Sequence, residues 1–226
     1  MIDLYTWSTP NGRKVSILLE ELGVPYEVHA VNIAKDEQLG PAFLRINPNN
    51  KIPAIVDRRT TSGDGVSPFK GATVFESGAI LAYLCDTTPG GEKFYPSSSS
   101  SPAERAEVLQ WLFWQVAGVG PMFGRAGRFL KETQHDAAWV ADEFLDEVMR
   151  LSRVMDGQLE RHNGMLASTG YSIADMACYP WLAGAGALVI KHRPAFGSLK
   201  HLSAWIEVVG ARPAVQRGMA IPAPPA

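Results

Sequence analysis

Cysteine is scarce in this sequence, and no disulfide or metal-binding pattern is visible. Only two cysteines occur in 226 residues, Cys85 and Cys178, and they form no Cys-x-x-Cys pair. The five histidines are scattered and form no cluster with metal-ligand spacing. This scarcity argues against a disulfide-stapled domain and a structural zinc site, and it suits a reducing compartment. We therefore expect a cytoplasmic protein without a bound metal.

A strong charge of either sign is also missing. The formal net charge is −2, from 21 basic and 23 acidic residues, so nothing favours a nucleic acid or an acidic membrane surface as a partner. We find no signal peptide and no apolar run long enough to span a bilayer, and we expect no membrane association. With 46% hydrophobic and 19% charged residues, the composition is that of a globular protein.

The first ninety residues alternate between strand and helix patterns. A helix joins the first two strands, so those strands should be parallel. The last two should be antiparallel, because a hairpin loop over 58–71 joins them. The expected order is β-α-β-α-β-β-α, a thioredoxin-like α/β layer. Its strands are expected at 2–7, 26–31, 54–56 and 73–75, and its helices at 14–22, 41–46 and 77–85.

Beyond Pro102 no strand pattern appears, and the periodicity predicts helices only. The stretch 89–102, rich in serine and glycine, is typical of a linker. We therefore expect a thioredoxin-like domain at 1–88, a linker at 89–102 and an all-α C-terminal domain at 103–226, with a loosely tied tail from Ile221. The expected helices lie at 103–124 (bent or broken near Gly120-Pro121), 137–163, 172–190 and 199–210.

A proline opens the buried strand in Lys51-Ile52-Pro53-Ala54-Ile55-Val56. A cis Ile52–Pro53 bond would turn the N–H and C=O of Ile52 toward solvent. An extended peptide could then pair with them as an additional strand. The competing interpretation is an ordinary trans proline at the start of a strand, and these residues alone favour it.

The stretch Phe75-Glu76-Ser77-Gly78-Ala79-Ile80 joins a strand to a helix. The unpaired N–H groups at a helix start favour an anion, and the Ser77 hydroxyl adds a donor. Glu76 can pair with an ammonium group. A plain helix cap is the competing interpretation, but the nearby Pro53 strand favours a ligand site.

These motifs, in this order, resemble the glutathione S-transferase family. The matches are Asn47-Pro48-Asn49-Asn50-Lys51-Ile52-Pro53-Ala54, Phe75-Glu76-Ser77-Gly78-Ala79-Ile80 and the helix start Tyr171-Ser172-Ile173-Ala174-Asp175, and they span nearly the whole chain. Two further stretches, Thr9-Pro10-Asn11-Gly12 and residues 109–115, resemble the bacterial nu-class, which reduces disulfides with glutathione. The resemblance implies glutathione as cosubstrate and a homodimer.

The resemblance also assigns roles in binding glutathione. Main-chain groups of Ile52 would pair with its cysteine, and Lys51 would meet the glycine carboxylate, unless Lys51 is an ordinary solvated lysine. Ser77 would bind the γ-glutamyl carboxylate and Glu76 the neighbouring ammonium group. Gln38 is carried over from the nu-class as a further glutathione-binding residue.

Thr9 and Asn11, between the first strand and the first helix, are the candidate catalytic residues, and Asn11 would also bind glutathione. A helix start contributes roughly 0.3–1 kcal/mol to a bound anion, less than one pKa unit. One or two direct hydrogen bonds of ~1.5–3 kcal/mol each would lower a thiol pKa to neutral or below. A helix-cap pair is the competing interpretation. Ser8 is a rival hydroxyl, and the resemblance selects Thr9.

Other notable residues receive structural interpretations. Cys85 and Cys178 are expected to be buried and inert. Trp111, Phe113 and Trp114 could line a substrate cleft, but core or subunit-interface packing is favoured.

Three functions remain open. The nu-class resemblance favours a glutathione-dependent disulfide-bond reductase acting on a small disulfide. The same first domain also fits a transferase that conjugates glutathione to electrophilic small molecules. A non-enzymatic glutathione-binding or regulatory module is the third possibility, because a fold does not fix a function.

Overall fold

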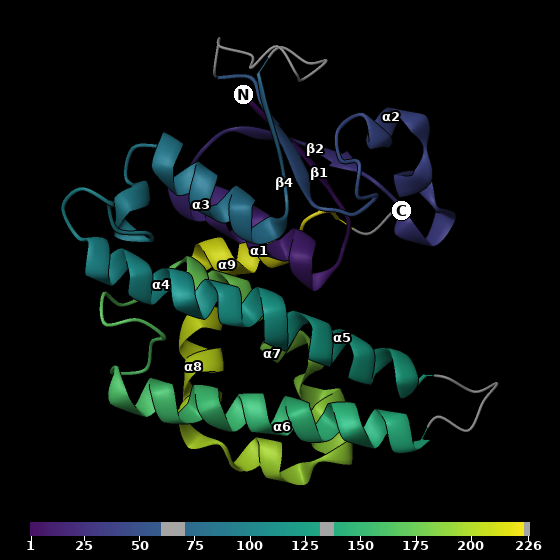
Figure 1. The fold of residues 1–226 in the computed structure, drawn as a ribbon, viewed down its shortest axis with the longest axis vertical. Coiled ribbons are helices and arrows are strands. Elements are labelled where there is room, and N and C mark those ends of the chain that lie inside the picture. The colour runs from purple at the N-terminus through teal and green to yellow at the C-terminus, as the bar shows by residue number, and fades with distance from the viewer. Residues whose placement is uncertain (60–70, 132–137, 224–226) are drawn as a thin grey trace. The chain divides into compact units, whose positions relative to one another are not determined.

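A computed structural model describes residues 1–59, 71–131 and 138–223, in two compact units (Figure 1). The first unit contains Met1–Gly91 together with the chain from Pro213 onward, and the second contains Glu92–Arg212. The last helix, α9 (Pro213–Met219), thus groups with the first unit. The sequence instead places 103–226 together in one helical domain.

The first unit is built on a four-stranded sheet with the strand order β2-β1-β3-β4. β1 and β2 are parallel, and β3 is antiparallel to both of its neighbours, β1 and β4. This arrangement confirms the predicted thioredoxin-like layer and its β-α-β-α-β-β-α order. The elements are β1 Ile2–Thr6, α1 Pro10–Leu22, β2 Tyr26–Ala30, α2 Pro41–Leu44, β3 Ala54–Asp57, β4 Ala72–Phe75 and α3 Ser77–Thr87. Most of the predicted hairpin loop, residues 60–70, lies outside the described residues.

Helix α1 begins four residues earlier than the sequence pattern indicates. Thr9 is its N-cap: the Thr9 Oγ1 accepts a hydrogen bond from the Gly12 N–H at 3.2 Å. Pro10 occupies the first turn, where its missing N–H costs nothing. The residues that look like a turn are therefore the start of the helix. At the other end Gly23 adopts the left-handed conformation (φ 64°), as the sequence predicts for a helix stop.

Both faces of the sheet are covered by apolar side chains. Figure 1 shows α1 and α3 on one side of the strands and α2 on the other. The α1 and α3 side buries residues that are all 0% exposed: Ile2, Leu4, Val15, Leu18, Ile55, Ile80, Leu81 and Leu84. The α2 side buries a second cluster made of Val31, Phe43, Ile46, Ala54 and Val56.

Helix α9 packs on α1. The Ser16 hydroxyl donates to the Gly218 C=O at 2.7 Å, and a Cβ placed on Gly218 would lie only 2.6 Å from the main chain of Ile17. Nearby, Glu20 accepts from the Tyr26 hydroxyl at 2.7 Å and pairs with Arg217 at 2.5 Å. The sequence predicts no helix here, because seven residues are too few to show a clear periodicity.

The second unit is helical. Within residues 92–131 and 138–212 the structure shows no strand, only one isolated bridge between Ala167 and Gly170. A π-helical segment, Gln115–Val119, interrupts the predicted long helix just before Gly120-Pro121, where proline breaks the hydrogen-bond ladder. The principal helices are α4 Pro102–Trp114, α5 Gly120–Phe129, α6 Ala138–Arg161, α7 Ile173–His192 and α8 Lys200–Gly210.

The start of α7 is held by a buried carboxylate. Asp175 is 0% exposed and accepts hydrogen bonds from the Ser172 N–H at 3.0 Å, the Leu166 N–H at 3.2 Å and the Trp205 Nε1–H at 2.9 Å. Burial raises the pKa of Asp175, and these donors oppose that rise. Ser172 and Asp175 form the predicted capping box, so this pair has a structural role.

One helix among the described residues, α7, is long and apolar enough to cross a membrane by length and composition. The expectation that no segment qualifies is therefore wrong by that measure. However, 56% of the 18-residue window is buried inside the protein, and a core helix of a globular unit passes the same test. The buried Asp175 and the internal Pro180 fit such a core helix.

Candidate active site

Three element ends meet at one edge of the sheet in the first unit. Tyr5, near the end of β1, pairs with Ala54 at the start of β3. Ala54 in turn pairs with Phe75 at the end of β4. The segments that leave β1, enter β3 and leave β4 therefore lie at the same edge. These segments contain most of the predicted site residues: Thr9, Asn11, Lys51, Ile52, Glu76 and Ser77.

The segment that enters β3 is held by a buried amide. The Ile52–Pro53 bond is cis. Within the described residues no hydrogen bond involves the N–H or C=O of Ile52. Asn47, which is 2% exposed, donates from Nδ2 to the Lys51 C=O at 2.6 Å and accepts from the Asn49 N–H at 2.9 Å. The Lys51 side chain is exposed.

Glu76 adopts an unusual backbone conformation at the junction of β4 and α3. Its φ is 69°, in a region that non-glycine residues rarely enter. Asn49 Nδ2 donates to the Glu76 Oε1 at 3.4 Å, which links the segment before β3 to the start of α3. Strained backbone of this kind clusters at ligand-binding and active sites. The exposed Glu76 side chain is therefore held at the edge where Ile52 lies.

Ser77 is the first residue of α3 and is 7% exposed. The Lys14 Nζ donates to its Oγ at 3.3 Å, and Lys14 is only 1% exposed. Sequence reasoning missed Lys14, because a lysine at the edge of an apolar helix stripe ordinarily faces solvent. It missed Asn47 for a similar reason, since an asparagine in a turn is usually exposed.

Thr9 lies at the start of α1, half-buried. Its Oγ1 accepts from the Gly12 N–H, so the Thr9 O–H hydrogen is left to donate elsewhere. The rival hydroxyl, Ser8, is exposed and its Oγ accepts from the Arg13 Nη2 at 3.0 Å. Asn11 is half-buried in the first turn of the same helix.

Gln38 lies in a 3-10 turn between β2 and α2. Its Nε2 donates to the Asp36 Oδ1 at 3.4 Å. Its Oε1 is buried and has no hydrogen-bond partner among the residues that the structure describes. Over those same residues no hydrogen bond joins Gln38 to the Thr9, Ile52 and Glu76 edge.

The aromatic residues of α4 belong to the second unit. Phe113 is 62% exposed, so it does not fill the core of this chain. The Trp111 and Trp114 rings pack edge to face with centroids 5.1 Å apart. Cys85 and Cys178 are both buried free thiols, as the sequence predicts.

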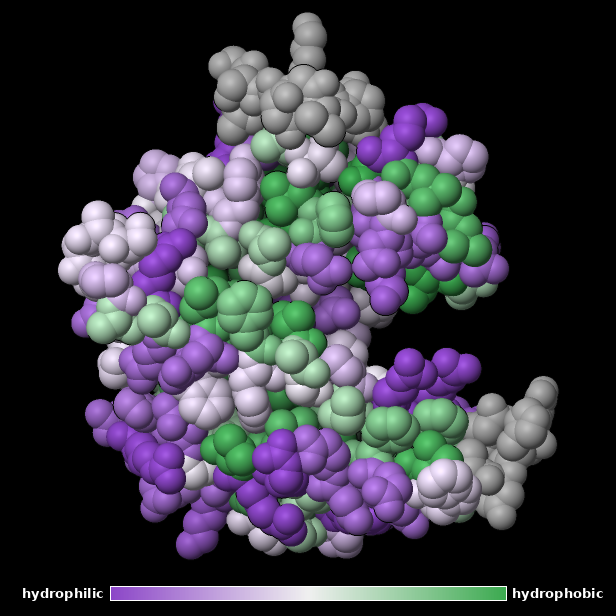
Figure 2. Space-filling view, viewed as in Figure 1, coloured by the Kyte–Doolittle hydropathy of each residue, from purple (hydrophilic) through white to green (hydrophobic). Residues whose placement is uncertain are grey.

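A pocket of about 310 Å³ lies on the α2 face of the sheet, and Tyr5, His29, Phe43 and Arg45 are among the residues that line it. Tyr5 stacks on His29 with ring centroids 4.6 Å apart. None of the predicted site residues lines this pocket. Figure 2 shows apolar residues gathered over the α2 region, where exposed apolar side chains include Ile33, Leu39 and Leu44.

One group of side chains in the described part of the chain has the spacing of metal ligands. Ligand atoms of Asp3, Glu27 and His29 lie within 4.8 Å of one another. The Arg58 Nε, however, donates to the Asp3 Oδ2 at 2.6 Å, so a guanidinium already neutralises one carboxylate. This competing cation disfavours a metal ion there.

Family models match most of both units. The model for the N-terminal domain of glutathione S-transferase matches residues 9–87, and the model for the C-terminal domain of glutathione S-transferase matches residues 119–213. The disulfide-bond oxidoreductase YfcG of Escherichia coli is 39% identical over 219 residues, which cover 97% of this chain and 94% of that protein. The chain belongs to the glutathione S-transferase family. Relatives named as oxidoreductases and transferases support a catalytic role, and the chain is a glutathione-dependent enzyme.

Solved transferase structures share the whole architecture. A glutathione transferase homologue from Lodderomyces elongisporus, with two glutathione molecules per subunit, has a TM-score of 0.88 at 32% identity and covers 98% of each chain. A glutathione transferase from Pseudomonas putida, with one glutathione disulfide per subunit, has a TM-score of 0.83 at 38% identity, covering 98% of this chain and 91% of that one.

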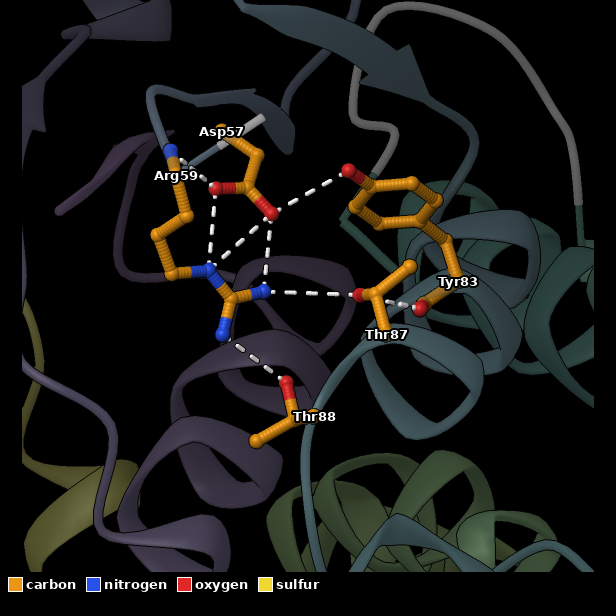
Figure 3. Close-up of polar contacts among 5 residues, drawn as sticks. All are labelled: Asp57, Arg59, Tyr83, Thr87 and Thr88. Atoms are coloured by element: carbon orange, nitrogen blue, oxygen red, sulfur yellow. Dashed lines mark hydrogen bonds and ion pairs between the residues drawn. The ribbon is translucent and has the colours of Figure 1, made fainter. Parts of the chain in front are cut away.

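In this chain a second polar cluster lies at the opposite end of β3 (Figure 3). Asp57 is buried, and Arg59 binds its carboxylate from Nε and Nη2 at 2.7–3.2 Å. The Tyr83 hydroxyl donates to Asp57 at 3.1 Å, and the guanidinium also donates to Thr87 and Thr88. Burial raises the pKa of Asp57, but the Arg59 and Tyr83 hydrogen bonds outweigh it and lower that pKa overall.

Proposed function

We propose that the protein is a glutathione-dependent disulfide-bond reductase. The observation that carries this proposal is the meeting of three element ends at one sheet edge, which gathers Thr9, Ile52 and Ser77. Such an edge offers main-chain groups for a peptide and two helix starts for anions. The Escherichia coli relative named as a disulfide-bond oxidoreductase supports the choice of reaction.

Glutathione would bind in an extended form along the segment before β3. Its cysteine would pair with the N–H and C=O of Ile52, as a neighbouring strand does. At one end the γ-glutamyl carboxylate would meet Ser77 and the start of α3, and the ammonium group would meet Glu76. At the other end the glycine carboxylate would meet the exposed Lys51.

The sulfur would then lie at the start of α1. Thr9 has an O–H hydrogen to donate, and Asn11 offers a side-chain amide in the same turn. A free thiol, with a pKa near ~8.5, is mostly protonated at neutral pH. Hydrogen bonds of ~1.5–3 kcal/mol each to the charged form would bring that pKa to neutral or below and maintain a thiolate.

The reaction proceeds by two exchanges. The glutathione thiolate attacks one sulfur of the substrate disulfide, so a new S–S bond forms and the other substrate sulfur leaves as a thiolate that takes up a proton. A second glutathione thiolate then attacks the glutathione sulfur of the mixed disulfide. Glutathione disulfide forms and the second substrate sulfur leaves, so that two glutathiones are oxidised and one disulfide is reduced.

The second glutathione would bind close to the first. The Lodderomyces elongisporus relative holds two glutathione molecules per subunit, which supports this expectation. The buried, unpartnered Oε1 of Gln38 is a candidate acceptor for a glutathione amide. A homodimer remains a prediction from the resemblance, and a cytoplasmic location remains a prediction from the scarcity of cysteine.

Conjugation of glutathione to an electrophilic carbon is the second candidate, because the matching family models are those of transferases. Parallel turnover assays with a small disulfide and with an aryl halide separate the two reactions. We expect disulfide reduction to be at least tenfold faster. Rapid conjugation without disulfide reduction would contradict the proposal, and no turnover with either substrate would favour a binding module.

A further inference from the structure

Lys14 is the most deeply buried cation in the described part of the first unit. It is 1% exposed, yet lysine side chains are almost never fully buried without a polar partner. Its Nζ lies 3.3 Å from the Ser77 Oγ, at the first turn of α3. A positive charge at a helix N-terminus is unfavourable, because the free N–H groups there already carry partial positive charge. Lys14 thus brings a buried positive charge to the edge where the proposed site lies.

This contact fixes the direction of the Ser77 hydroxyl. An ammonium group has three donors and no acceptor, so in the Lys14–Ser77 hydrogen bond the serine oxygen must accept. The Ser77 hydrogen then points away from Lys14. It is available to donate to an anion at the start of α3.

We propose that Lys14 is a positioning residue for the γ-glutamyl carboxylate of glutathione, acting through Ser77. This inference rests on the proposed function and deepens it. The bound carboxylate would receive the Ser77 O–H and the N–H groups of α3. At the same time its negative charge would be attracted to the nearby Lys14 ammonium group. The buried ammonium group therefore makes the site selective for a ligand that carries a carboxylate at this position.

Binding measurements with two ligands test the inference in the full chain. S-methylglutathione retains the γ-glutamyl carboxylate and cannot form a thiolate, so it reports binding alone. A matched analogue, S-methylated 4-aminobutyryl-cysteinyl-glycine, lacks only that carboxylate. Isothermal titration calorimetry gives the ratio of the two dissociation constants. A general loss of structure would not change this ratio.

Lys14→Met removes the charge at similar side-chain length. We expect it to weaken S-methylglutathione binding about tenfold to a hundredfold, and to change binding of the decarboxylated analogue less than about twofold. Lys35→Met, the same substitution at an exposed lysine of the first unit, should leave both constants unchanged. In a Ser77→Ala background, Lys14→Met should weaken binding clearly less, because the two residues act through the same hydrogen bond.

Equal losses for the two ligands in Lys14→Met, or no loss, would overturn the inference while the proposed function stands. If Lys14→Met does not fold, Lys14→Gln provides the decision, since it removes the charge but keeps a polar end and should show the same selective loss. An unchanged ratio in Lys14→Gln overturns the inference as well. If the unaltered protein binds no S-methylglutathione, the proposed function itself fails, and the inference with it.

Discussion

Thr9 combines a structural and a proposed chemical role in one hydroxyl. The oxygen caps α1 by accepting from the Gly12 N–H, and this leaves the hydrogen to donate. Ser77 has the same arrangement, with Lys14 as the donor to its oxygen. At both residues the hydroxyl oxygen accepts from a group that can only donate, the Gly12 N–H or the Lys14 ammonium group. The hydroxyl hydrogen therefore points away from that group. The same principle would therefore hold both the sulfur and the carboxylate of one ligand.

Thr9→Val tests the proposed role of this hydroxyl, because it keeps the shape of the side chain and removes the O–H. We expect kcat/KM for disulfide reduction to fall about tenfold to a hundredfold, since the thiolate loses one direct hydrogen bond. The pH at which activity reaches half its maximum should rise, because the bound thiol then has a higher pKa. Loss of the helix cap should lower the unfolding free energy by about 1 kcal/mol.

Two companion variants separate these effects. Thr9→Ser retains the hydroxyl and should keep most of the activity and an unshifted pH profile. Ser8→Ala removes the exposed rival hydroxyl and should leave activity unchanged. If Ser8→Ala lost activity and Thr9→Val did not, Ser8 would be the group that contacts the sulfur.

The apolar pattern was sufficient to predict the strands but not their order or register, so the resemblance to the glutathione S-transferase family was needed to place the candidate site residues together. Thr9, Ile52 and Ser77 all flank predicted strands. Lys14 and Asn47 could not be found this way. Their burial depends on which elements pack against them, and a single sequence does not contain that information in its local pattern.

At the scale of elements, the cluster around Asp57 joins the end of β3 to the end of α3. Asp57 lies on β3, whereas Tyr83, Thr87 and the adjacent Thr88 come from α3 and its C-cap. Arg59 connects all of them (Figure 3). This cluster lies at the end of β3 opposite to Ile52, so it stabilises the unit without touching the proposed ligand site.

Asp57→Asn should destabilise the protein in a pH-dependent way. Removing one partner of a buried ion pair costs roughly 3 kcal/mol at neutral pH. Because the pKa of Asp57 is lowered in the folded protein, its contribution is present above its ordinary pKa of 3.8 and is lost as the pH falls through the folded value. The free energy of unfolding, measured with urea, should therefore differ less between the unaltered protein and Asp57→Asn below about pH 4.

Tyr83→Phe provides the graded comparison, since it removes a single donor to the same carboxylate. We expect a loss of about 1 kcal/mol at neutral pH. If the loss of unfolding free energy in Asp57→Asn stayed constant from pH 7 to pH 3, the pKa of the Asp57 carboxylate would not be lowered by folding, and the prediction would be contradicted.

Element boundaries were less predictable than element types. The start of α1 was missed because Ser8-Thr9-Pro10 has the composition of a turn as well as that of a helix cap. Helix α9 was missed because its seven residues rely on α1 for stability, and such tertiary support leaves little trace in a short sequence. The capping box at Ser172, in contrast, is a local signal and was read correctly.

On the scale of the whole molecule, the chain forms most of the first unit, then the helical unit, and then returns to the first unit as α9. The return is secured by close main-chain contact at Gly218, where there is no room for a side chain. The first unit is therefore assembled from two separated parts of the sequence. Its stability depends on the close fit of α9 to α1.

Gly218→Ala tests this dependence against a matched substitution. A Cβ at Gly218 would lie 2.6 Å from the main chain of Ile17, so α9 must shift, and we expect a loss of about 1–3 kcal/mol. Gly157→Ala, in α6, meets nothing within 4 Å and should stabilise its helix by about 0.5–1 kcal/mol. Hydrogen exchange should speed up in α1 only for Gly218→Ala. Equal effects of the two variants on α1 exchange would contradict the dependence.

The separation of α1 from α9 along the chain also bears on biosynthesis. A ribosome makes residues 10–22 about two hundred positions before residues 213–219, at roughly 5–20 residues per second. The nascent α1 therefore waits some ten seconds or longer with its α9 surface uncovered. During that interval the growing polypeptide is exposed to chaperones and proteases. The surface of α1 is covered only after residues 213–219 emerge from the exit tunnel and α9 packs on it.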